Sequence, residues 1–445
     1  VLDRLGFGLG RFARCGGLHL QRSSALARSR LQLGRALLRA VLHRLGLCRR
    51  RRCGGLQTCC LLRLLSLGRL PGRGLDLHID EINPDSLLIR SQVLTDGDLN
   101  RSLKCIGRAG AGTNNVPVID ATNKGIVVFN TPGANANAVK ELVVCGMLLS
   151  SRGIIQGNAY AKTLSGQDNA LLNASMESQK KNFKGNELKG KTLGIVGLGA
   201  IGSLLAQTAE VMGMKIIGFD PHISVDSAWR LPRDVERAET MEYLLSNSDY
   251  ISLHVPLIDA TKDLISKETI KFIKKGAKLI NLSRGGIVNN EDIIDALNQN
   301  ILSGFVTDFP TPELVERSSS FHDVILLPHI GASTKEAEVN CAVMAADQVT
   351  NFLKNGVIIN SVNFPRIKLG KTAEHRLVII NKNEPGMIGK ITDELGSNKI
   401  NIADMTHKSR DSIGISLIDL DEKPSKELVE NIKNIDHVIS VRLCK

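Results

Sequence analysis

One stretch of the chain decides its fold: residues 192–218, which read TLGIVGLGAIGSLLAQTAEVMGMKIIG. The apolar run at its start predicts a buried parallel strand. Three glycines follow in the pattern Gly-x-Gly-x-x-Gly, and they open a helix whose apolar residues recur at helical spacing. A second apolar strand, residues 214–219, ends at the acidic Asp220. Strand, glycine turn, helix, strand and acid in this order predict a dinucleotide-binding βαβ unit.

Each part of this unit has a physical purpose. The first glycine permits the tight turn, the second lets a pyrophosphate approach the backbone, and the third lets helix and strand pack closely. The free N–H groups at the helix start attract the anion. A carboxylate after the second strand accepts hydrogen bonds from ribose hydroxyls and repels a 2′-phosphate, which predicts NAD as the cofactor. The residues expected to contact it here are Gly197, Gly199, Ala200, Ile201, Gly202 and Asp220.

The basic charge of the chain is confined to its first 75 residues. The 445 residues have a formal net charge of +12. Residues 1–75 contain 16 arginines, no lysine and one acid, so they carry +15 and the remaining residues carry −3. The body therefore lacks the basic stripe of a nucleic-acid-binding protein. No apolar run approaches the roughly 20 residues that cross a membrane, and no metal-ligand pattern stands out.

Residues 1–75 also differ from the rest of the chain in amino-acid composition, because they lack Ile, Asn, Lys, Met, Tyr and Glu and hold five of the nine cysteines. We interpret them as a leader that is not native to this protein, such as an out-of-frame translation. An organelle transit peptide and an arginine-rich nucleic-acid arm are the alternatives. The other cysteines are scattered and predict free thiols in a reducing compartment. A cytoplasmic location follows, unless the leader is a transit peptide.

From about residue 80, apolar strands alternate with amphipathic helices. Early strands are expected at residues 86–90, 103–107 and 126–129, before a helix at 138–151. After the βαβ unit, strands are expected at 250–255, 277–282, 304–307 and 324–327, with helices at 267–273, 290–298 and 334–353. This alternation predicts an α/β fold with a doubly wound parallel sheet. Three loops at strand ends, which read NLSRGG, TDFPTPE and PHIGAST, are expected to form the site.

The last 70 residues follow another order of elements, after a polar linker at residues 360–375. The expected elements are a strand at 377–381, a helix at 387–395, strands at 400–408 and 414–419, a helix at 425–434 and a strand at 438–443. The order βαββαβ predicts a ferredoxin-like domain.

Six motifs, in chain order, resemble those of the D-isomer-specific 2-hydroxyacid dehydrogenases: IGRAGAGTNNVPV, FNTPGANANAVKEL, GIVGLGAIG, INLSRGGIV, VTDFPTPE and PHIGASTKEAE. The C-terminal module is similar to an ACT domain, which senses amino acids. The resemblance covers residues 82–445 and implies a Rossmann NAD domain inserted in a flavodoxin-like substrate domain. The implied boundaries are 76–130 and 331–366 for the substrate domain, 131–330 for the NAD domain and 375–445 for the ACT domain. The leader stands where the first part of the substrate domain belongs.

The resemblance also implies the catalytic residues. Arg284 corresponds to the arginine that binds the substrate's carboxylate and carbonyl, and His329 to the group that takes the hydroxyl proton. Glu313 corresponds to the carboxylate that pairs with this histidine and raises its pKa. Further cofactor positions are His254, Val255, Pro256, Asp308 and Gly331. Substrate positions are Arg90 and Ser91 for a phosphate, Gly110, Ala111 and Asn135 for the carboxylate end, and Arg152 as a second phosphate ligand.

The implied activity is the NAD-dependent oxidation of D-3-phosphoglycerate to 3-phosphohydroxypyruvate, the first step of L-serine biosynthesis. The alternatives are another member of the family, acting on glyoxylate, hydroxypyruvate or D-lactate, and an NAD-binding protein made inactive by its N-terminus. Serine-inhibited members carry a histidine just after the first strand of the ACT domain, two residues before an asparagine, and these positions are Asn381 and Asn383 here. Asn401 matches another ligand position. Asn381 departs from the family pattern and cannot become cationic, but it still hydrogen-bonds a small zwitterion, so L-serine or another amino acid is an expected ligand. A homo-oligomer, dimer or tetramer, is also implied.

Overall fold

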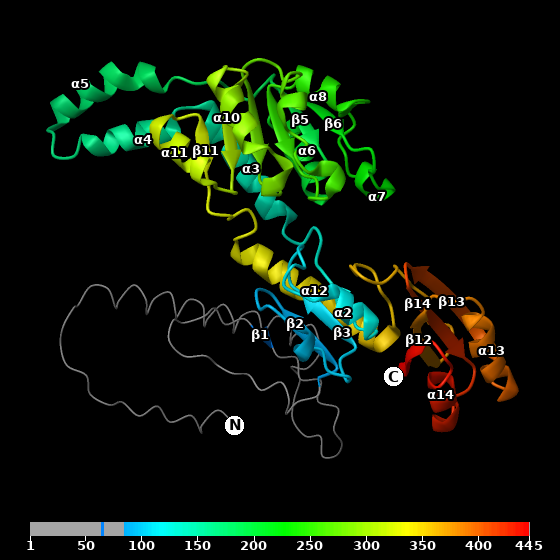
Figure 1. Cartoon of the computed structure of the whole chain (residues 1–445). Helices are drawn as coiled ribbons and strands as arrows, with labels where there is room; N and C mark the ends of the chain where they lie inside the picture. The colour runs from blue at the N-terminus through cyan, green and yellow to red at the C-terminus, as the bar shows by residue number, and fades with distance from the viewer. Residues whose placement is uncertain (1–63, 66–83, 445) are drawn as a thin grey trace, which may run out of the picture.

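A computed structural model describes residues 64–65 and 84–444 (Figure 1). Their strands form three sheets: a four-stranded parallel sheet, a seven-stranded parallel sheet and a four-stranded antiparallel sheet. Figure 1 shows these sheets in blue to cyan, in green to yellow and in orange to red, in the order of the chain.

The seven-stranded sheet has the strand order β11-β10-β9-β8-β5-β6-β7. The chain enters it at β5 (Thr192–Val196), moves outward through β6 (Lys215–Phe219) and β7 (Glu236–Arg237), and returns to β8 (Tyr250–Leu253) on the other side of β5. The direction of winding therefore reverses between β5 and β8. Ligands of doubly wound sheets bind at such a switch point, beyond the carboxyl ends of the strands.

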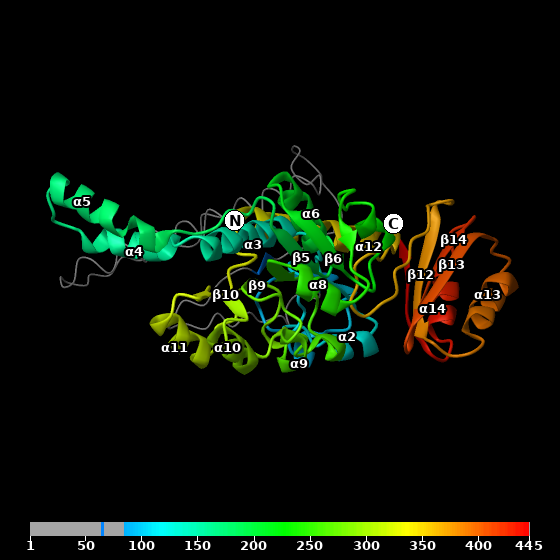
Figure 2. The same cartoon turned by 90° about the horizontal axis from the view of Figure 1, so that it is seen from above.

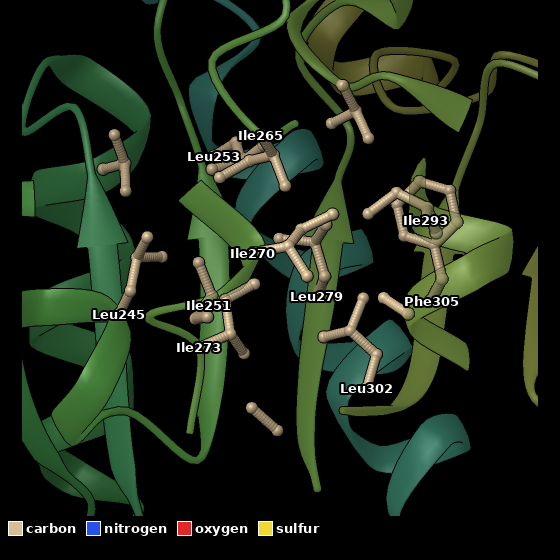
Figure 3. Close-up of a cluster of buried hydrophobic side chains, with 14 of the residues drawn as sticks. Leu245, Ile251, Leu253, Ile265, Ile270, Ile273, Leu279, Ile293, Leu302 and Phe305 are labelled. Atoms are coloured by element: carbon tan, nitrogen blue, oxygen red, sulfur yellow. The ribbon is translucent and has the colours of Figure 1, made fainter. Parts of the chain in front are cut away.

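Helices cover both faces of this sheet, because its strands are apolar on both sides. The remaining strands are β9 (Ala277–Asn281), β10 (Leu302–Thr307) and β11 (Val324–Leu326). The helices are α3 (Ala136–Ser151), α6 (Ala200–Val211), α7 (Val225–Ala228), α8 (Met241–Asn247), α9 (Lys267–Ile270), α10 (Asn290–Asn298) and α11 (Pro312–Ser320), with 3₁₀ turns η4 (Asp259–Thr261) and η5 (Gly285–Ile287). Figure 3 shows one face, where Ile251, Leu279 and Phe305 pack with Ile270 and Ile293.

The four-stranded parallel sheet has the order β1-β2-β3-β4. Its elements are β1 (Leu64–Leu65), β2 (Ser86–Ile89), η2 (Asp96–Asp98), β3 (Cys105–Arg108), α2 (Val118–Asn123) and β4 (Val127–Phe129). After the seven-stranded sheet, the chain returns through the 21-residue α12 (Lys335–Asn355), which packs on this first sheet. The seven-stranded sheet is thus inserted in sequence between β4 and α12, which pack together in one domain.

The antiparallel sheet has the order β13-β14-β12-β15. Its elements are β12 (His375–Lys382), α13 (Met387–Ser397), β13 (Ile402–Arg410), β14 (Ile413–Leu420), α14 (Lys426–Lys433) and β15 (Val438–Cys444). One face packs on α13 and α14 through residues such as Ile379 and Ile418. The opposite face packs on α12, where Ile380 and Leu417 share a buried cluster with Phe352. The central strands β12 and β14 are therefore buried on both faces, whereas the edge strands β13 and β15 are partly exposed.

Two arginines of the antiparallel sheet bind the C-terminal end of α12. Arg442 donates to the carbonyl oxygens of Phe352 and Leu353, at 2.5 and 2.8 Å, and Arg376 donates to that of Asn355 at 3.1 Å. Arg376 is also paired with the buried Asp419, at 2.5 and 2.7 Å. The last carbonyls of a helix have no partner within it, and cations satisfy them well.

A helical hairpin projects from the seven-stranded domain (Figures 1 and 2). It consists of α4 (Ile154–Thr163), α5 (Asn169–Gln179) and the 3₁₀ turn η3 (Lys180–Phe183). No residue of α4 or α5 is buried. Four apolar side chains of the hairpin are exposed, namely Ile154, Ile155, Leu171 and Met176.

The structure confirms the predicted α/β fold, with its doubly wound sheet and its ferredoxin-like C-terminal module. Four helices were not expected: α2, α7, α8 and α11. The expectation that TDFPTPE is wholly a loop is wrong, because Pro312 and Glu313 form the first turn of α11. The interpretation of residues 1–75 lies outside the described residues, except that Leu64–Leu65 pairs in parallel with β2.

Candidate active site

The glycine turn between β5 and α6 has the shape that a dinucleotide requires. Gly197 has a φ of +92°, and a Cβ there would lie 2.7 Å from the carbonyl oxygen of His254. A Cβ at Gly202 would lie 2.1 Å from the carbonyl oxygen of Gly197. At Gly199, by contrast, a Cβ would meet no atom within 4 Å, so this position faces open space. The turn thus leaves room for an anion at the start of α6, which fits the pyrophosphate of NAD.

Asp220 directly follows β6 and lies beside this turn. Its Oδ2 accepts a hydrogen bond from the amide of Leu198 at 2.8 Å, and its Oδ1 accepts one from the amide of His222 at 2.9 Å. These bonds fix the carboxylate, and each oxygen keeps a further lone pair for a ribose hydroxyl. Ala200 and Ile201, in the first turn of α6, are partly exposed beside it. The arrangement fits the adenosine half of NAD.

The loop after β8 forms the other side of the glycine turn. The His254 amide donates to the carbonyl of Val196 at 2.7 Å, and a Cβ on Gly197 would lie 3.0 Å from Val255. The His254 ring bonds the hydroxyl of Ser252 at 2.9 Å. Burial lowers the pKa of His254 to about 4, so the ring is neutral at physiological pH. Pro256 follows in the exposed part of the loop.

Asp308 is a buried carboxylate at the end of β10. Its Oδ2 accepts a hydrogen bond from the amide of Gly331 at 3.1 Å, and its backbone carbonyl accepts one from the amide of His329 at the same distance. Burial raises the pKa of Asp308, whereas the Gly331 amide and the charges of His329 and Arg284 oppose the rise. Asp308 therefore lies within electrostatic reach of both predicted catalytic residues and holds the loop that carries one of them.

Arg284 and His329 are both exposed, on neighbouring loops after β9 and β11. The Arg284 guanidinium donates to the carbonyl of Ser283 at 2.7 Å, and its Nη2 would lie 3.7 Å from a Cβ on Gly112. Arg284 thus reaches from the seven-stranded sheet to the loop after β3. The His329 ring stacks on Phe309, with 4.9 Å between the ring centroids. Both side chains are close enough to Asp308 for their charges to lower its pKa.

The structure does not bring Glu313 to His329. Among the described residues, no ion pair or hydrogen bond within 4 Å joins the two side chains. Glu313 is exposed in the first turn of α11, where a hydrogen bond from its own amide lowers the pKa of its carboxyl. The predicted pairing is therefore absent from this structure, because the helix start directs Glu313 toward its own amide.

Three guanidinium groups gather at the ends of β2, β3 and β9. Burial lowers the pKa of Arg108, and the charges of Arg90 and Arg284 lower it further. The Arg108 guanidinium lies over Gly110, where a Cβ would be 1.7 Å from its Nη1. We call Arg90, Arg108 and Arg284 the arginine cluster. Sequence reasoning missed Arg108, although its place at a strand end, within GRAGAG, was an available signal.

Neighbouring loops hold the other predicted substrate positions. The Asn115 amide group donates to the backbone carbonyls of Arg90 and Gln92, at 3.2 and 2.7 Å, and so fixes the exposed Ser91 between them. Asn115 is a further positioning residue that the sequence did not indicate. In the next loop, the carbonyls of Gly110 and Ala111 accept hydrogen bonds, at 3.0 and 2.8 Å, from the segment after β4.

The segment after β4 leads to the glycine turn. A Cβ on Gly133 would lie 3.1 Å from the Cβ of Ala200, and Asn135 begins α3 two residues later. Asn135 therefore lies near the crevice. Arg152 follows the other end of the 16-residue α3, about 24 Å from Asn135 at 1.5 Å per residue. The structure thus places Arg152 away from the arginine cluster of the same chain.

The three regulatory asparagines do not meet in one antiparallel domain. Asn381 pairs with Gly414 in the sheet, is 1% exposed, and has a buried Oδ1 without a hydrogen-bond partner. Asn383 lies beside it and donates to the carbonyl of Asp411 at 3.0 Å. Asn401 donates to Asp421 at 2.5 Å at the opposite end of the sheet, about 20 Å along the strands.

Within residues 64–65 and 84–444, no group of three or more His, Cys, Asp or Glu side chains could hold a metal ion. Over the same residues, no helix has the length and apolar character that crossing a membrane requires.

Comparison with known proteins agrees with this geometry. Residues 147–331 match the NAD-binding domain of the D-isomer-specific 2-hydroxyacid dehydrogenases, and residues 375–437 match the ACT domain. The chain is 33% identical to the D-3-phosphoglycerate dehydrogenase of Dictyostelium discoideum over 352 residues, 77% of this chain and 82% of that enzyme. It is 37% identical to the enzyme of the same name from Bacillus subtilis over 292 residues, 64% of this chain and 53% of that enzyme.

A solved structure supports the same assignment. The chain resembles the NAD⁺-bound 3-phosphoglycerate dehydrogenase of Entamoeba histolytica with a TM-score of 0.51 and 30% identity, over 66% of this chain and 87% of that one. The chain therefore belongs to the family of D-isomer-specific 2-hydroxyacid dehydrogenases, with an NAD-binding domain and an ACT domain.

Proposed function

We propose that the chain oxidises D-3-phosphoglycerate to 3-phosphohydroxypyruvate with NAD, the first step of L-serine biosynthesis. The observation that carries this proposal is the arginine cluster, whose members lie at the carboxyl ends of β2, β3 and β9, where the charges of Arg90 and Arg284 lower the pKa of Arg108. Guanidinium groups bind carboxylates and phosphates through two parallel hydrogen bonds. A substrate that has a carboxylate at one end and a phosphate at the other matches such a cluster.

Each cationic group has a proposed task. Arg284 binds the substrate carboxylate and the oxygen that becomes a carbonyl. Arg90 and Arg108, at adjacent strand ends, bind the phosphate. The exposed His329 accepts the hydroxyl proton, and NAD, when bound, accepts the hydride. Asp308 holds the His329 loop through Gly331. The pairing of Glu313 with His329 stays a prediction, and it requires α11 or the His329 loop to move.

Kinetics with matched substrates test this function. Purified protein is assayed with NAD and D-3-phosphoglycerate, and in parallel with D-glycerate, D-lactate and, in reverse, glyoxylate and hydroxypyruvate. We expect the highest kcat/KM for the phosphorylated substrate, and at least a tenfold loss with NADP because Asp220 repels the 2′-phosphate. A preference for an unphosphorylated acid would support the alternative enzymes of the family. No turnover with any of them, while NADH still binds, would support an inactive NAD-binding protein.

The domain boundaries are part of the proposal. We assign residues 76–130 and 331–366 to the substrate domain, 131–330 to the NAD domain and 375–445 to the ACT domain. The packing of α12 on β2 to β4 supports joining the two segments of the substrate domain. The free thiols of Cys105, Cys145, Cys341 and Cys444 support the cytoplasm as the location.

We further propose a homo-oligomer that binds L-serine or another amino acid at its ACT domains. The exposed apolar side chains of α4 and α5 favour a protein partner on that hairpin. Asn401 and the pair Asn381 and Asn383 lie at opposite ends of the sheet. They would come together only across two copies of the domain. Titration calorimetry with L-serine, followed by inhibition kinetics, tests the ligand.

A further inference from the structure

One carboxylate faces the arginine cluster. Glu338, in the first turns of α12, has its Oε1 3.1 Å from Nη2 of Arg90. Among the residues that the structure describes, no other carboxylate forms an ion pair with Arg90, Arg108 or Arg284. The Arg90 and Glu338 side chains are 34% and 30% exposed, so the pair is accessible to a small solute.

The charges here are unequal. Three guanidinium groups against one carboxylate leave an excess of positive charge. A phosphate monoester carries about −1.5 to −2 at pH 7 and binds guanidinium groups as a carboxylate does. A phosphate that binds Nη2 of Arg90 competes with the Glu338 carboxylate for that donor, and two anions repel each other at this range.

We propose that Glu338 is a counter-ion that the substrate's phosphate must displace from Arg90. This inference rests on the proposed function, and it makes Glu338 a positioning residue that acts through Arg90. Without substrate, Glu338 holds the Arg90 guanidinium beside Arg108. When the phosphate binds, the Glu338 carboxylate turns away into solvent. Glu338 therefore weakens the binding of phosphorylated substrates and has little effect on substrates that lack a phosphate.

The substitution Glu338→Gln tests this inference. Glutamine keeps the shape of the side chain and can still accept a hydrogen bond from Arg90, but it has no charge. We expect the KM for D-3-phosphoglycerate to fall about fivefold, the scale of a partly exposed ion pair. The inhibition constant of inorganic phosphate should fall by a similar factor. The kcat with D-3-phosphoglycerate and the KM for D-glycerate should stay within about twofold.

A matched control separates this effect from a change of net charge. Glu336 lies in the same turn of α12 and is exposed, and it has no ion pair with the arginine cluster. Glu336→Gln removes the same charge from the same helix start and should leave both KM values unchanged. Glu338→Asp provides a second test, because its shorter side chain withdraws the carboxylate from Arg90 and should lower the phosphoglycerate KM less than glutamine does.

Four outcomes overturn the inference. They are a higher phosphoglycerate KM in Glu338→Gln, an unchanged one, an equal fall for D-glycerate, and an equal fall in the Glu336→Gln control. A higher KM would mean that the carboxylate only holds Arg90 in place. Failure of the proposed function looks different, because the unmodified protein would then not oxidise D-3-phosphoglycerate at all.

Discussion

His329 has a backbone conformation that few side chains adopt, with a φ of 50°. Asparagine tolerates this left-handed region, so His329→Asn preserves the loop and removes the imidazole. We expect kcat with D-3-phosphoglycerate to fall about 10² to 10⁴-fold, the usual contribution of a positioned acid or base. The Kd for NADH, measured by its fluorescence, should stay within about twofold. His322→Asn, at an exposed position after α11, is the control and should keep full activity.

His254 gives the protein a defined pH dependence of stability. Its pKa falls from the ordinary value of 6.5 to about 4 because burial disfavours the charged ring. Below about pH 6.5 the unfolded chain binds a proton at this position that the folded chain does not. This contribution to stability is thus present above pH 6.5 and is lost as the pH falls toward 4.

The substitution His254→Gln removes that titration. We expect the Tm of the unmodified protein to drop more between pH 7 and pH 5 than the Tm of the variant. His322→Gln changes an exposed histidine and should leave the drop unaltered. An equal fall of Tm between pH 7 and pH 5 in His254→Gln and in the unmodified protein would show that the folded state does not keep the His254 ring neutral.

The residue scale also shows what sequence reasoning could and could not find. The glycine turn was predictable because the need for glycine there is local: a Cβ at Gly197 or Gly202 would clash with neighbouring backbone. Arg108 could have been suspected from its place at a strand end, but its role and that of Asn115 depend on Arg90, which follows a different strand, β2. The segment around Glu313 was expected to be a loop, but Pro312 starts α11 there, and the pairing of Glu313 with His329 stays a prediction.

At the scale of elements, β12 and β14 are joined by the buried pair of Arg376 and Asp419, which are 1% and 0% exposed. Asp419 also accepts hydrogen bonds from Thr372. Asp419→Asn leaves the Arg376 charge buried without a counter-charge, which costs about 3–5 kcal/mol in comparable cases. We expect the urea unfolding midpoint to fall accordingly, with m unchanged.

The control for this prediction is Glu430→Gln, which breaks the exposed pair with Lys433 on α14. Exposed pairs contribute about 0–1 kcal/mol, so its midpoint should hardly move. Equal effects of the two substitutions would contradict the special weight of the buried pair. Strands β12 and β14 were both predicted from the sequence. That Arg376 and Asp419 face each other could not be predicted, because they are 43 residues apart.

At the scale of the whole molecule, the proposed homo-oligomer is expected to assemble through the exposed apolar side chains of the α4–α5 hairpin. Leu171 and Met176 are 59% and 41% exposed, and neither helix has a buried residue. We expect the double substitution of Leu171 and Met176 by lysine to lower the mass measured by light scattering to that of a smaller assembly. The matched control replaces two exposed valines outside the hairpin, Val211 on α6 and Val225 on α7, by lysine. A mass that is unchanged in the hairpin variant would exclude the hairpin as the interface.

The sequence of modules was predictable over most of the chain, since strict alternation of strands and helices indicates a parallel sheet and the order βαββαβ indicates a ferredoxin-like module. Their packing was not, because the contact of α12 with both sheets depends on side chains that are far apart in sequence, such as Phe129, Phe352 and Leu417.

The long helix α12 has one end at Arg90 and the other beneath Arg376 and Arg442. A protein cut after residue 366 would lose both capping guanidinium groups and would expose Phe352, over whose ring Arg442 lies. The ACT domain therefore contributes to the stability of α12 as well as offering a ligand site. Removal of the ACT domain would destabilise α12, the helix that holds Glu338 beside Arg90. A truncated enzyme should therefore be less stable and should bind phosphate with a different affinity.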